Sequence, residues 1–390
     1  MKSNWKLTRL GDIIEFNPKE SVKKGTLAKK IAMDKLQPFC RDISEYSIEE
    51  FSGGSKFRNG DTIMARITPC LENGKTAKVS ILEDKEVGFG STEFIVLRAK
   101  EGLADPDFIY YLMCSPEIRE CAIKSMVGSS GRQRVQLDVV ENLEVELPDL
   151  YEQERIGKIL RTIDDKIELN NRINNNLEQQ ARLIFNNFFF QADKDRSCWK
   201  ETSLLNIADY LNGLAMQKYR PQNNEPSLPV LKIKELRQGI CDNSSDLCSS
   251  HISSEYIIHN GDVIFSWSGT LLVDFWTGGE CGLNQHLFKV TSTKYEKWFY
   301  YLWTKHHLDN FIDIAANKAT TMGHIKRSDL QSSIVLVPPV EEYNHISSII
   351  TPLFNEAISR RIENNELSKL RNILLTKLLS NDTNNLDSTL

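Results

Sequence analysis

Residues 5–13 read Trp-Lys-Leu-Thr-Arg-Leu-Gly-Asp-Ile, and residues 199–207 read Trp-Lys-Glu-Thr-Ser-Leu-Leu-Asn-Ile. The two stretches share a tryptophan, a lysine, a threonine, a leucine and an isoleucine at the same spacing, with an offset of 199 − 5 = 194. Similarity within one chain at a long offset is the signature of a repeated structural unit. The sequence therefore predicts two copies of one unit.

Further blocks repeat in the same order. Asn-Gly-Asp-Thr-Ile at 59–63 recurs as Asn-Gly-Asp-Val-Ile at 260–264, and Phe-Ile-Tyr-Tyr-Leu at 108–112 recurs as Trp-Phe-Tyr-Tyr-Leu at 298–302. Between the blocks the two halves differ strongly, as loops do on a shared scaffold. A common frame with different intervening segments predicts two modules that do the same job on different targets.

Each half begins with a mixed pattern. Residues 1–150 alternate short β-type runs with turns, while 105–113 and 116–124 have helical spacing. This pattern predicts an α+β module. Gly88 and Gly90 fall between two β-type runs and are expected in a turn.

A long helical pattern follows each module. The first starts after Pro148 and the second after Pro338, and each predicted helix has roughly 35–40 residues, on the order of 50–60 Å in length. Long helices with a narrow apolar seam usually pack on another helix. Their matched lengths favour antiparallel packing of the two helices, and the alternative is that each packs only on its own module. Heptad-like spacing of positions 160, 163, 167, 170, 174 and 177 places Asn174 near the seam.

The predicted fold class is therefore α+β, with two mixed α/β modules separated by two long helices that form an antiparallel coiled coil. The predicted boundaries are 1–150 for the first module, 151–190 for the first helix, 191–198 for a linker, 199–340 for the second module, 341–380 for the second helix and 381–390 for a flexible tail.

Composition limits the possible classes of protein. The 390 residues are 40% hydrophobic and carry a formal net charge of −5. No apolar run approaches the roughly 20 residues that span a bilayer, and no signal-peptide pattern is present, so a cytoplasmic protein is expected. The eight cysteines form no Cys-x-x-Cys pair, which makes disulfides and a zinc site unexpected. The acidic balance predicts weak DNA binding by the isolated chain.

No catalytic pattern is found in the sequence. A Gly-x-x-x-x-Gly-Lys-Ser/Thr phosphate loop is missing, and the histidines show no metal or base–nucleophile spacing. The carboxylate pairs Asp164-Asp165 and Glu341-Glu342 are expected at or near helix N-termini, where they would offset the helix dipole rather than form a nuclease centre. The chain is predicted not to be an enzyme, and to have no cofactor or metal of its own.

Polar clusters nevertheless suit contact with DNA, because base edges are read by Arg, Lys, Asn and Gln, and phosphates by Arg, Lys, Ser and Thr. Solvated surface charge is the alternative for each single residue. The two strongest candidates are Arg132-Gln133-Arg134 and the loop from Lys318 to Lys326, because they occupy matching places in the repeat. The candidate DNA-binding residues are Lys23, Lys24, Lys29, Lys30, Arg66, Thr68, Ser129, Ser130, Arg132, Gln133 and Arg134 in the first module, and Gln217, Lys218, Arg220, Lys232, Lys234, Arg237, Lys318, Thr320, Thr321, His324 and Lys326 in the second.

Taken together, these motifs resemble the specificity subunits of type I restriction–modification systems. The opening at 5–13 is similar to the start of a target recognition domain, and Gly90-Ser-Thr-Glu-Phe94 resembles a strand motif of the family. Gly131-x-Gln133-x-Val135, followed by Leu147-Pro148 and Glu152-Gln153, resembles the junction into a conserved helix. The second half is looser, with Tyr343 in the place of Gln153.

The resemblance implies that each module reads one part of a split site in double-stranded DNA. It implies that the helices set the unread spacer and dock two methyltransferase subunits, which bring S-adenosylmethionine. A separate motor–nuclease subunit would bring ATP and magnesium chemistry. The alternatives are a specificity subunit of a related modification or phage-defence system without the motor, and a two-headed assembly scaffold with no role in DNA binding.

Overall fold

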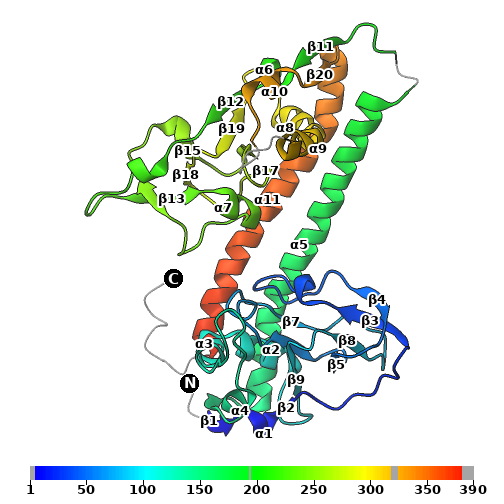
Figure 1. Cartoon of the computed structure of the whole chain (residues 1–390), viewed down its shortest axis with the longest axis vertical. Helices are drawn as coiled ribbons and strands as arrows, with labels where there is room; N and C mark the ends of the chain where they lie inside the picture. Colours follow the sequence, from blue (N-terminus) through cyan, green and yellow to red (C-terminus); the bar gives the residue numbers. More distant parts are fainter. Residues whose placement is uncertain (1–4, 193–194, 318–323, 380–390) are drawn as a thin grey trace. The chain divides into compact units, whose positions relative to one another are not determined.

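The computed structural model describes residues 5–192, 195–317 and 324–379. They form two compact units (Figure 1). The first unit contains the residues up to Glu168 and those from Leu367 onward, and the second is Leu169–Glu366. Each unit therefore contains one α/β module and a segment of both long helices, α5 (Leu150–Phe190) and α11 (Val340–Leu379).

The first module contains, in chain order, β1 (Lys6–Arg9), α1 (Leu10–Ile13), β2 (Ile14–Phe16), β3 (Leu27–Ile31), η1 (Met33–Lys35), β4 (Ser47–Glu50), β5 (Ser55–Phe57), β6 (Thr62–Ala65), β7 (Thr76–Lys78), β8 (Gly88–Gly90), β9 (Phe94–Ala99), α2 (Pro106–Cys114), α3 (Pro116–Lys124), α4 (Leu137–Glu141) and β10 (Glu144–Leu147). One antiparallel sheet has the order β2-β9-β6-β7, and a second has the order β4-β3-β8-β5 with β3 and β8 parallel. The first and last strands, β1 and β10, pair antiparallel and close the module.

The second module contains β11 (Lys200–Ser203), α6 (Leu204–Ile207), β12 (Asp209–Asn212), η2 (Met216–Lys218), β13 (Ser227–Leu231), α7 (Ile233–Gln238), β14 (Leu247–Ser249), η3 (Ser254–Tyr256), β15 (Ile257–Ile258), β16 (Val263–Ser266), β17 (Leu272–Phe275), β18 (Cys281–Leu283), β19 (Leu287–Thr291), α8 (Lys297–His306), α9 (Leu308–Asn317), α10 (Arg327–Gln331) and β20 (Ile334–Val337). Its sheets have the orders β12-β19-β16-β17 and β14-β13-β18-β15, and β11 pairs with β20. The topology of the first module is thus repeated strand for strand, with α7 in the place of η1.

Local signals explain several elements. Helix α2 starts at Pro106, whose fixed backbone φ angle suits the first helical turn. The Asp105 carboxylate caps this helix, because it accepts a hydrogen bond from the backbone amide of Phe108 at 2.8 Å. The turn predicted at Gly88 and Gly90 is wrong, because both lie in strand β8. A Cβ on Gly90 would approach the carbonyl oxygen of Ile31 to 2.5 Å, so glycine permits close pairing with β3.

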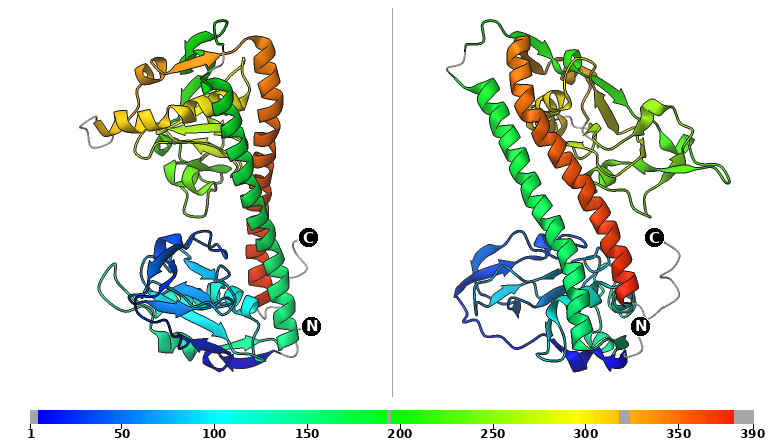
Figure 2. Two further views of the ribbon diagram at one scale, coloured as in Figure 1. Left: turned by 90° about the vertical axis from the view of Figure 1, so that its right-hand side faces the viewer. Right: turned by 180° about the vertical axis from the view of Figure 1, so that it is seen from behind.

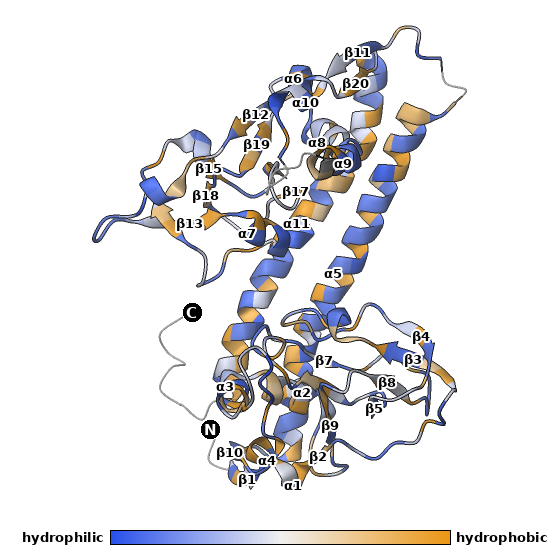
Figure 3. Cartoon of the chain, in the orientation of Figure 1, coloured by the Kyte–Doolittle hydropathy of each residue, from blue (hydrophilic) through white to orange (hydrophobic). Residues whose placement is uncertain are grey.

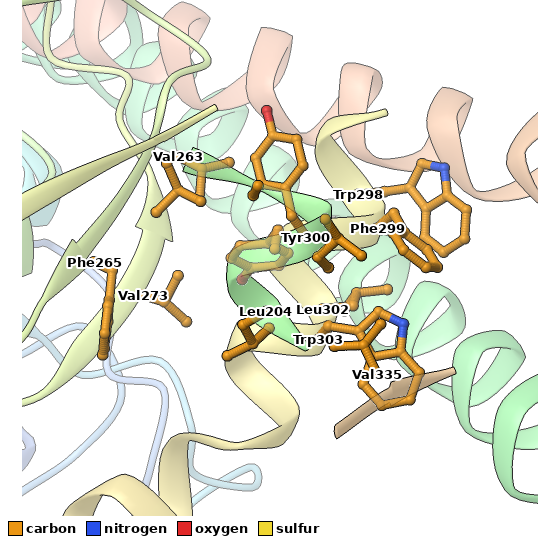
Figure 4. Close-up of a cluster of buried hydrophobic side chains, with 14 of the residues drawn as sticks. Leu204, Val263, Phe265, Val273, Trp298, Phe299, Tyr300, Leu302, Trp303 and Val335 are labelled. Carbon is orange, nitrogen blue, oxygen red and sulfur yellow. The ribbon is translucent and has the colours of Figure 1, made fainter. Parts of the chain in front are cut away.

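Aromatic side chains fill the core of the second module (Figure 4). Trp298, Phe299 and Trp303 of α8 are almost completely buried, in one cluster with Val263 and Phe265 of β16. Large aromatic rings bury much apolar surface, so this helix and sheet fix one another. Hydrophobic and hydrophilic residues alternate along both long helices (Figure 3).

In the second unit, α5 and α11 lie side by side and run antiparallel (Figure 2). Asn170 of α5 bonds to Asn364 of α11 at 2.8 Å, and Glu178 of α5 pairs with Arg361 of α11. Residue numbers thus rise along one helix while they fall along the other. Apolar residues of both helices join the core of the second module, namely Ala181, Phe185, Phe189, Ile346, Ile350 and Phe354.

In the first unit, the beginning of α5 lies beside the end of α11. Ile156, Leu160 and Leu375 share one buried cluster with the first module. The carboxylate of Asp164 accepts hydrogen bonds from Arg371 at 2.8 Å and from the Tyr111 hydroxyl at 2.6 Å. The prediction that Asp164 and Asp165 lie at or near a helix N-terminus is wrong, because α5 begins at Leu150 and both residues lie well inside it, where they bind side chains. Glu341 and Glu342 do lie in the first turn of α11.

These contacts confirm the predicted fold class and the antiparallel packing of the helices. Each helix also packs on a module, so the two packing modes considered for the sequence occur together. Positions 160, 163, 170 and 174 are buried and 167 and 177 are half-buried, as the seam predicted. No helix in the described ranges combines the length and apolar character needed to cross a membrane.

Candidate nucleic-acid interface

The loop at Arg132-Gln133-Arg134 is one arm of a short hairpin in which Val127 pairs with Arg134. At its tip, Gly128 and Gly131 have φ angles of 136° and 75°, which favour glycine. Ser129, Ser130 and Arg132 are exposed, and Gln133 and Arg134 are half-buried. The hairpin presents polar side chains, as the sequence predicted.

The end of β6 lies against this hairpin. The amide of Val135 donates to the carbonyl of Arg66 at 2.9 Å, and the amide of Thr68 donates to the carbonyl of Gln133 at 3.0 Å. The Thr68 hydroxyl donates to the same carbonyl at 3.2 Å, so it is partly committed to holding the loop. Two candidate clusters that are about 65 residues apart in sequence are therefore neighbours in the fold.

Glu93 joins the two clusters. Its carboxylate accepts hydrogen bonds from Arg134 Nε at 2.9 Å and Nη2 at 2.7 Å, and it lies 3.8 Å from Arg66 Nε. The hydrogen bonds from Arg134 hold the pKa of the Glu93 carboxyl below its ordinary value. We call Arg66, Glu93 and Arg134 the first corner. Sequence reasoning missed Glu93 as a site residue, although it lies in the quoted Gly-Ser-Thr-Glu-Phe motif.

The second module has backbone equivalents of all three positions. The amide of Ile325 donates to the carbonyl of Trp267 at 2.9 Å, as Val135 does to Arg66. Ser268 forms a bridge with His324, as Ile67 does with Arg134. Backbone hydrogen bonds also join Trp267 to His286 and Arg66 to Glu93 in the same way. We call Trp267, His286 and His324 the second corner.

The chemistry of the second corner is different. The Trp267 ring lies 6.1 Å from the His286 ring and 6.2 Å from the His324 ring, measured between centroids. Trp267 Nε1 donates to the Asn212 side chain at 2.9 Å, and His286 Nδ1 lies 3.0 Å from the Ser268 hydroxyl. The first corner is charged, while the second is built from aromatic and imidazole rings.

The remaining candidates of the first module divide into two groups. Lys23 and Lys24 are exposed on the loop before β3. Lys29 is largely buried, pairs with Glu86 at 3.1 Å and donates to the carbonyl of Ile81, so its charge serves the fold. Lys30 pairs with Glu49 at 2.8 Å.

The second module shows the same division. Gln217, Lys218, Arg220, Arg237 and Lys326 are exposed. Lys232 pairs with Asp246, and Lys234 donates to the Ser244 hydroxyl at 2.7 Å. The candidates outside the described residues are Lys318, Thr320 and Thr321. Within the described residues, no group of three or more His, Cys, Asp or Glu side chains could hold a metal ion.

Two modules of one topology, each with a half-buried corner of different chemistry, define a two-module recognition protein. The family model described as "Type I restriction modification DNA specificity domain" matches residues 2–179 and again residues 197–369. The chain therefore belongs to this family, and it carries two of these domains.

Individual relatives agree with this assignment. The chain is 24% identical over 309 residues to the MjaIX type I restriction enzyme specificity subunit of Methanocaldococcus jannaschii, an alignment that covers 72% of this chain and 69% of that protein. It is 32% identical over 161 residues to the EcoAI specificity subunit of Escherichia coli, covering 40% of this chain and 27% of that one. The solved S subunit of a type I restriction–modification system from M. genitalium has a similar fold, with a TM-score of 0.60, 12% identity and 97% coverage of both chains.

Proposed function

We propose that this chain is the sequence-reading subunit of a type I restriction–modification complex, and that each module reads one part of a bipartite DNA site. The observation that carries the proposal is the pair of equivalent corners, where one backbone arrangement presents Arg66, Glu93 and Arg134 in one module and Trp267, His286 and His324 in the other. At this equivalent position one module carries charged side chains and the other aromatic and imidazole rings, a difference that suits two modules reading different sequences.

The long helices would set the unread spacer and dock modification subunits. S-adenosylmethionine would be held by the two methyltransferase subunits, and ATP and magnesium by a motor–nuclease subunit, while this chain contributes recognition and no catalysis.

The test is methylome sequencing of cells that express the chain with its modification subunit. We expect one asymmetric, bipartite motif whose methylation depends on the chain. Exchange of residues 1–150 for those of a relative should change one half of the motif only. The proposal is wrong if no modified motif depends on the chain, or if the exchange alters both halves.

A further inference from the structure

The two corners occupy equivalent backbone positions, yet the first presents charged side chains to a ligand and the second presents aromatic and imidazole rings. In the first corner, Arg134 donates hydrogen bonds from Nε and Nη2 to the Glu93 carboxylate. Its Nη1 forms no hydrogen bond with any residue that the structure describes. The side chains of Arg66 and Arg134 keep 38% and 43% of their surface exposed, so the corner is accessible to a ligand.

We infer that the first corner selects a guanine in the half-site of the first module, and that the corner is the equivalent specificity-determining position in both modules. This inference rests on the proposed function and deepens it. The major-groove edge of guanine offers two acceptors, N7 and O6, and arginine is the side chain that most often reads them. Two guanidinium groups around one carboxylate leave a net charge of +1, which suits an acceptor edge.

Glu93 is a positioning residue in this arrangement. Its two-point contact fixes the plane of the Arg134 guanidinium before any ligand arrives, and such preorganisation lowers the entropy lost on binding. As a stabilising ion pair it would contribute little, because exposed pairs are worth about 0–1 kcal/mol. Arg66 Nε is buried, makes no hydrogen bond within the described ranges and lies 3.8 Å from the Glu93 carboxylate, so it adds positive charge to the corner without itself being a contact point for a ligand. Such a donor is a cost to the free protein.

The second corner cannot make the same selection. Trp267 Nε1 already donates to Asn212, and His286 is engaged by Ser268. No arginine stands at any of its three positions. Aromatic faces instead suit contact with the methyl group of thymine. The second half-site therefore lacks a guanine requirement at the equivalent position.

The experiment compares methylomes of cells that express variants with the modification subunit. Exchange of residues 1–150 identifies the half of the motif that the first module reads. In that half, we expect Arg134→Ala and Arg134→Lys to lower the preference for guanine over the other bases at one position at least tenfold. The other half of the motif should be unchanged. The lysine variant keeps the charge and loses the fork geometry. Lys124→Ala, which removes an exposed charge from α3 of the same module, is the matched control and should leave the motif intact.

The reverse change tests the equivalence of the corners. The triple variant Trp267→Arg, His286→Glu, His324→Arg should gain a guanine preference in the second half-site. Because three changes can disturb folding, melting temperature is measured in parallel, and His324→Arg alone is the second variant. The inference is overturned if Arg134→Ala and the double variant Arg66→Ala/Arg134→Ala keep the wild-type preference for guanine in the first half-site. It is also overturned if the triple variant of the second corner folds but shows no preference for guanine in the second half-site. A wild-type chain that directs no modification would instead overturn the proposed function.

Discussion

In each of the two units, a buried arginine of α11 forms an ion pair with a carboxylate of α5. The two arginines differ in the number of carboxylates that they bind. In the first unit, Arg371 of α11 binds one carboxylate, Asp164, whose side chain is only 4% exposed. In the second, Arg361 of α11 binds two carboxylates, Glu178 and Asp274, at 24% and 29% exposure. Arg371 has no second carboxylate to replace Asp164 among the ion pairs of the described residues, whereas Arg361 keeps one partner if it loses the other. The two buried arginines of α11 therefore differ in how far each depends on a single carboxylate.

The largest effect is expected from breaking the deeper pair. Asp164→Ala leaves Arg371 buried without its carboxylate and removes the acceptor of the Tyr111 hydroxyl. We expect a loss of about 3–5 kcal/mol in unfolding free energy. Asp274→Ala is the matched change and should cost about 1–2 kcal/mol, because Glu178 remains to pair with Arg361. Urea unfolding of both variants measures the difference, and equal losses would contradict it.

The corners give a second contrast, between binding and folding. Replacement of Arg132, Gln133 and Arg134 by alanine should weaken binding of the assembled complex to its site by about 1–3 kcal/mol for each bidentate pair that these side chains make with a base edge. The melting temperature should stay near that of the wild type, because these side chains are exposed or half-buried. Lys29→Ala should do the reverse, since Lys29 binds Glu86 and the carbonyl of Ile81. If the triple variant melts far below the wild type, the hairpin has a structural role instead.

Two asparagines in the α5 seam give a third contrast, between paired and unpaired polar groups. Asn174 Oδ1 is buried and accepts no hydrogen bond from the residues in the described ranges. Asn174→Leu should therefore raise the unfolding free energy by about 1 kcal/mol. Asn170 bonds to Asn364, Glu363 and Arg360, so Asn170→Leu should lower it by about 1–3 kcal/mol. Thermal melting of the two variants should shift in opposite directions, and a shift in the same direction would be inconsistent with this account.

The smallest effect concerns acid pH at the first corner. The pKa of Glu93 is lowered in the fold, so its stabilising contribution is present above the ordinary carboxyl pKa of 4.5 and is lost as pH falls through the lowered value. Wild type should be more stable than Glu93→Gln by less than about 1 kcal/mol at pH 7. The difference should shrink at about pH 3, and urea titrations at both pH values test this. A difference that stays constant with pH would exclude the ionised pair as its cause.

Local patterns in the sequence were sufficient to predict the duplication, the change from mixed to helical pattern after Pro148 and Pro338, and the apolar seam. Periodicity and turn residues act over short stretches of chain, so α3 and the long helices lie almost where they were predicted. The polar hairpin at Arg132-Gln133-Arg134 was also visible, because glycine, serine and arginine together rarely enter a core.

Which of these residues meet depends on the tertiary structure alone. The pairing of β6 with β9 brings Arg66 next to Glu93, and the bridge from Ile67 to Arg134 completes the corner. Likewise the antiparallel register of α5 and α11 within the first unit places Asp164 against Arg371, and so turns an expected helix-dipole residue into a buried ion-pair partner. The burial of the Lys29 side chain could not be predicted either, because its position in β3 does not reveal that Glu86 is its ion-pair partner. All three cases have the same cause: strand register and helix packing join residues far apart in the chain, and no local pattern encodes those partners.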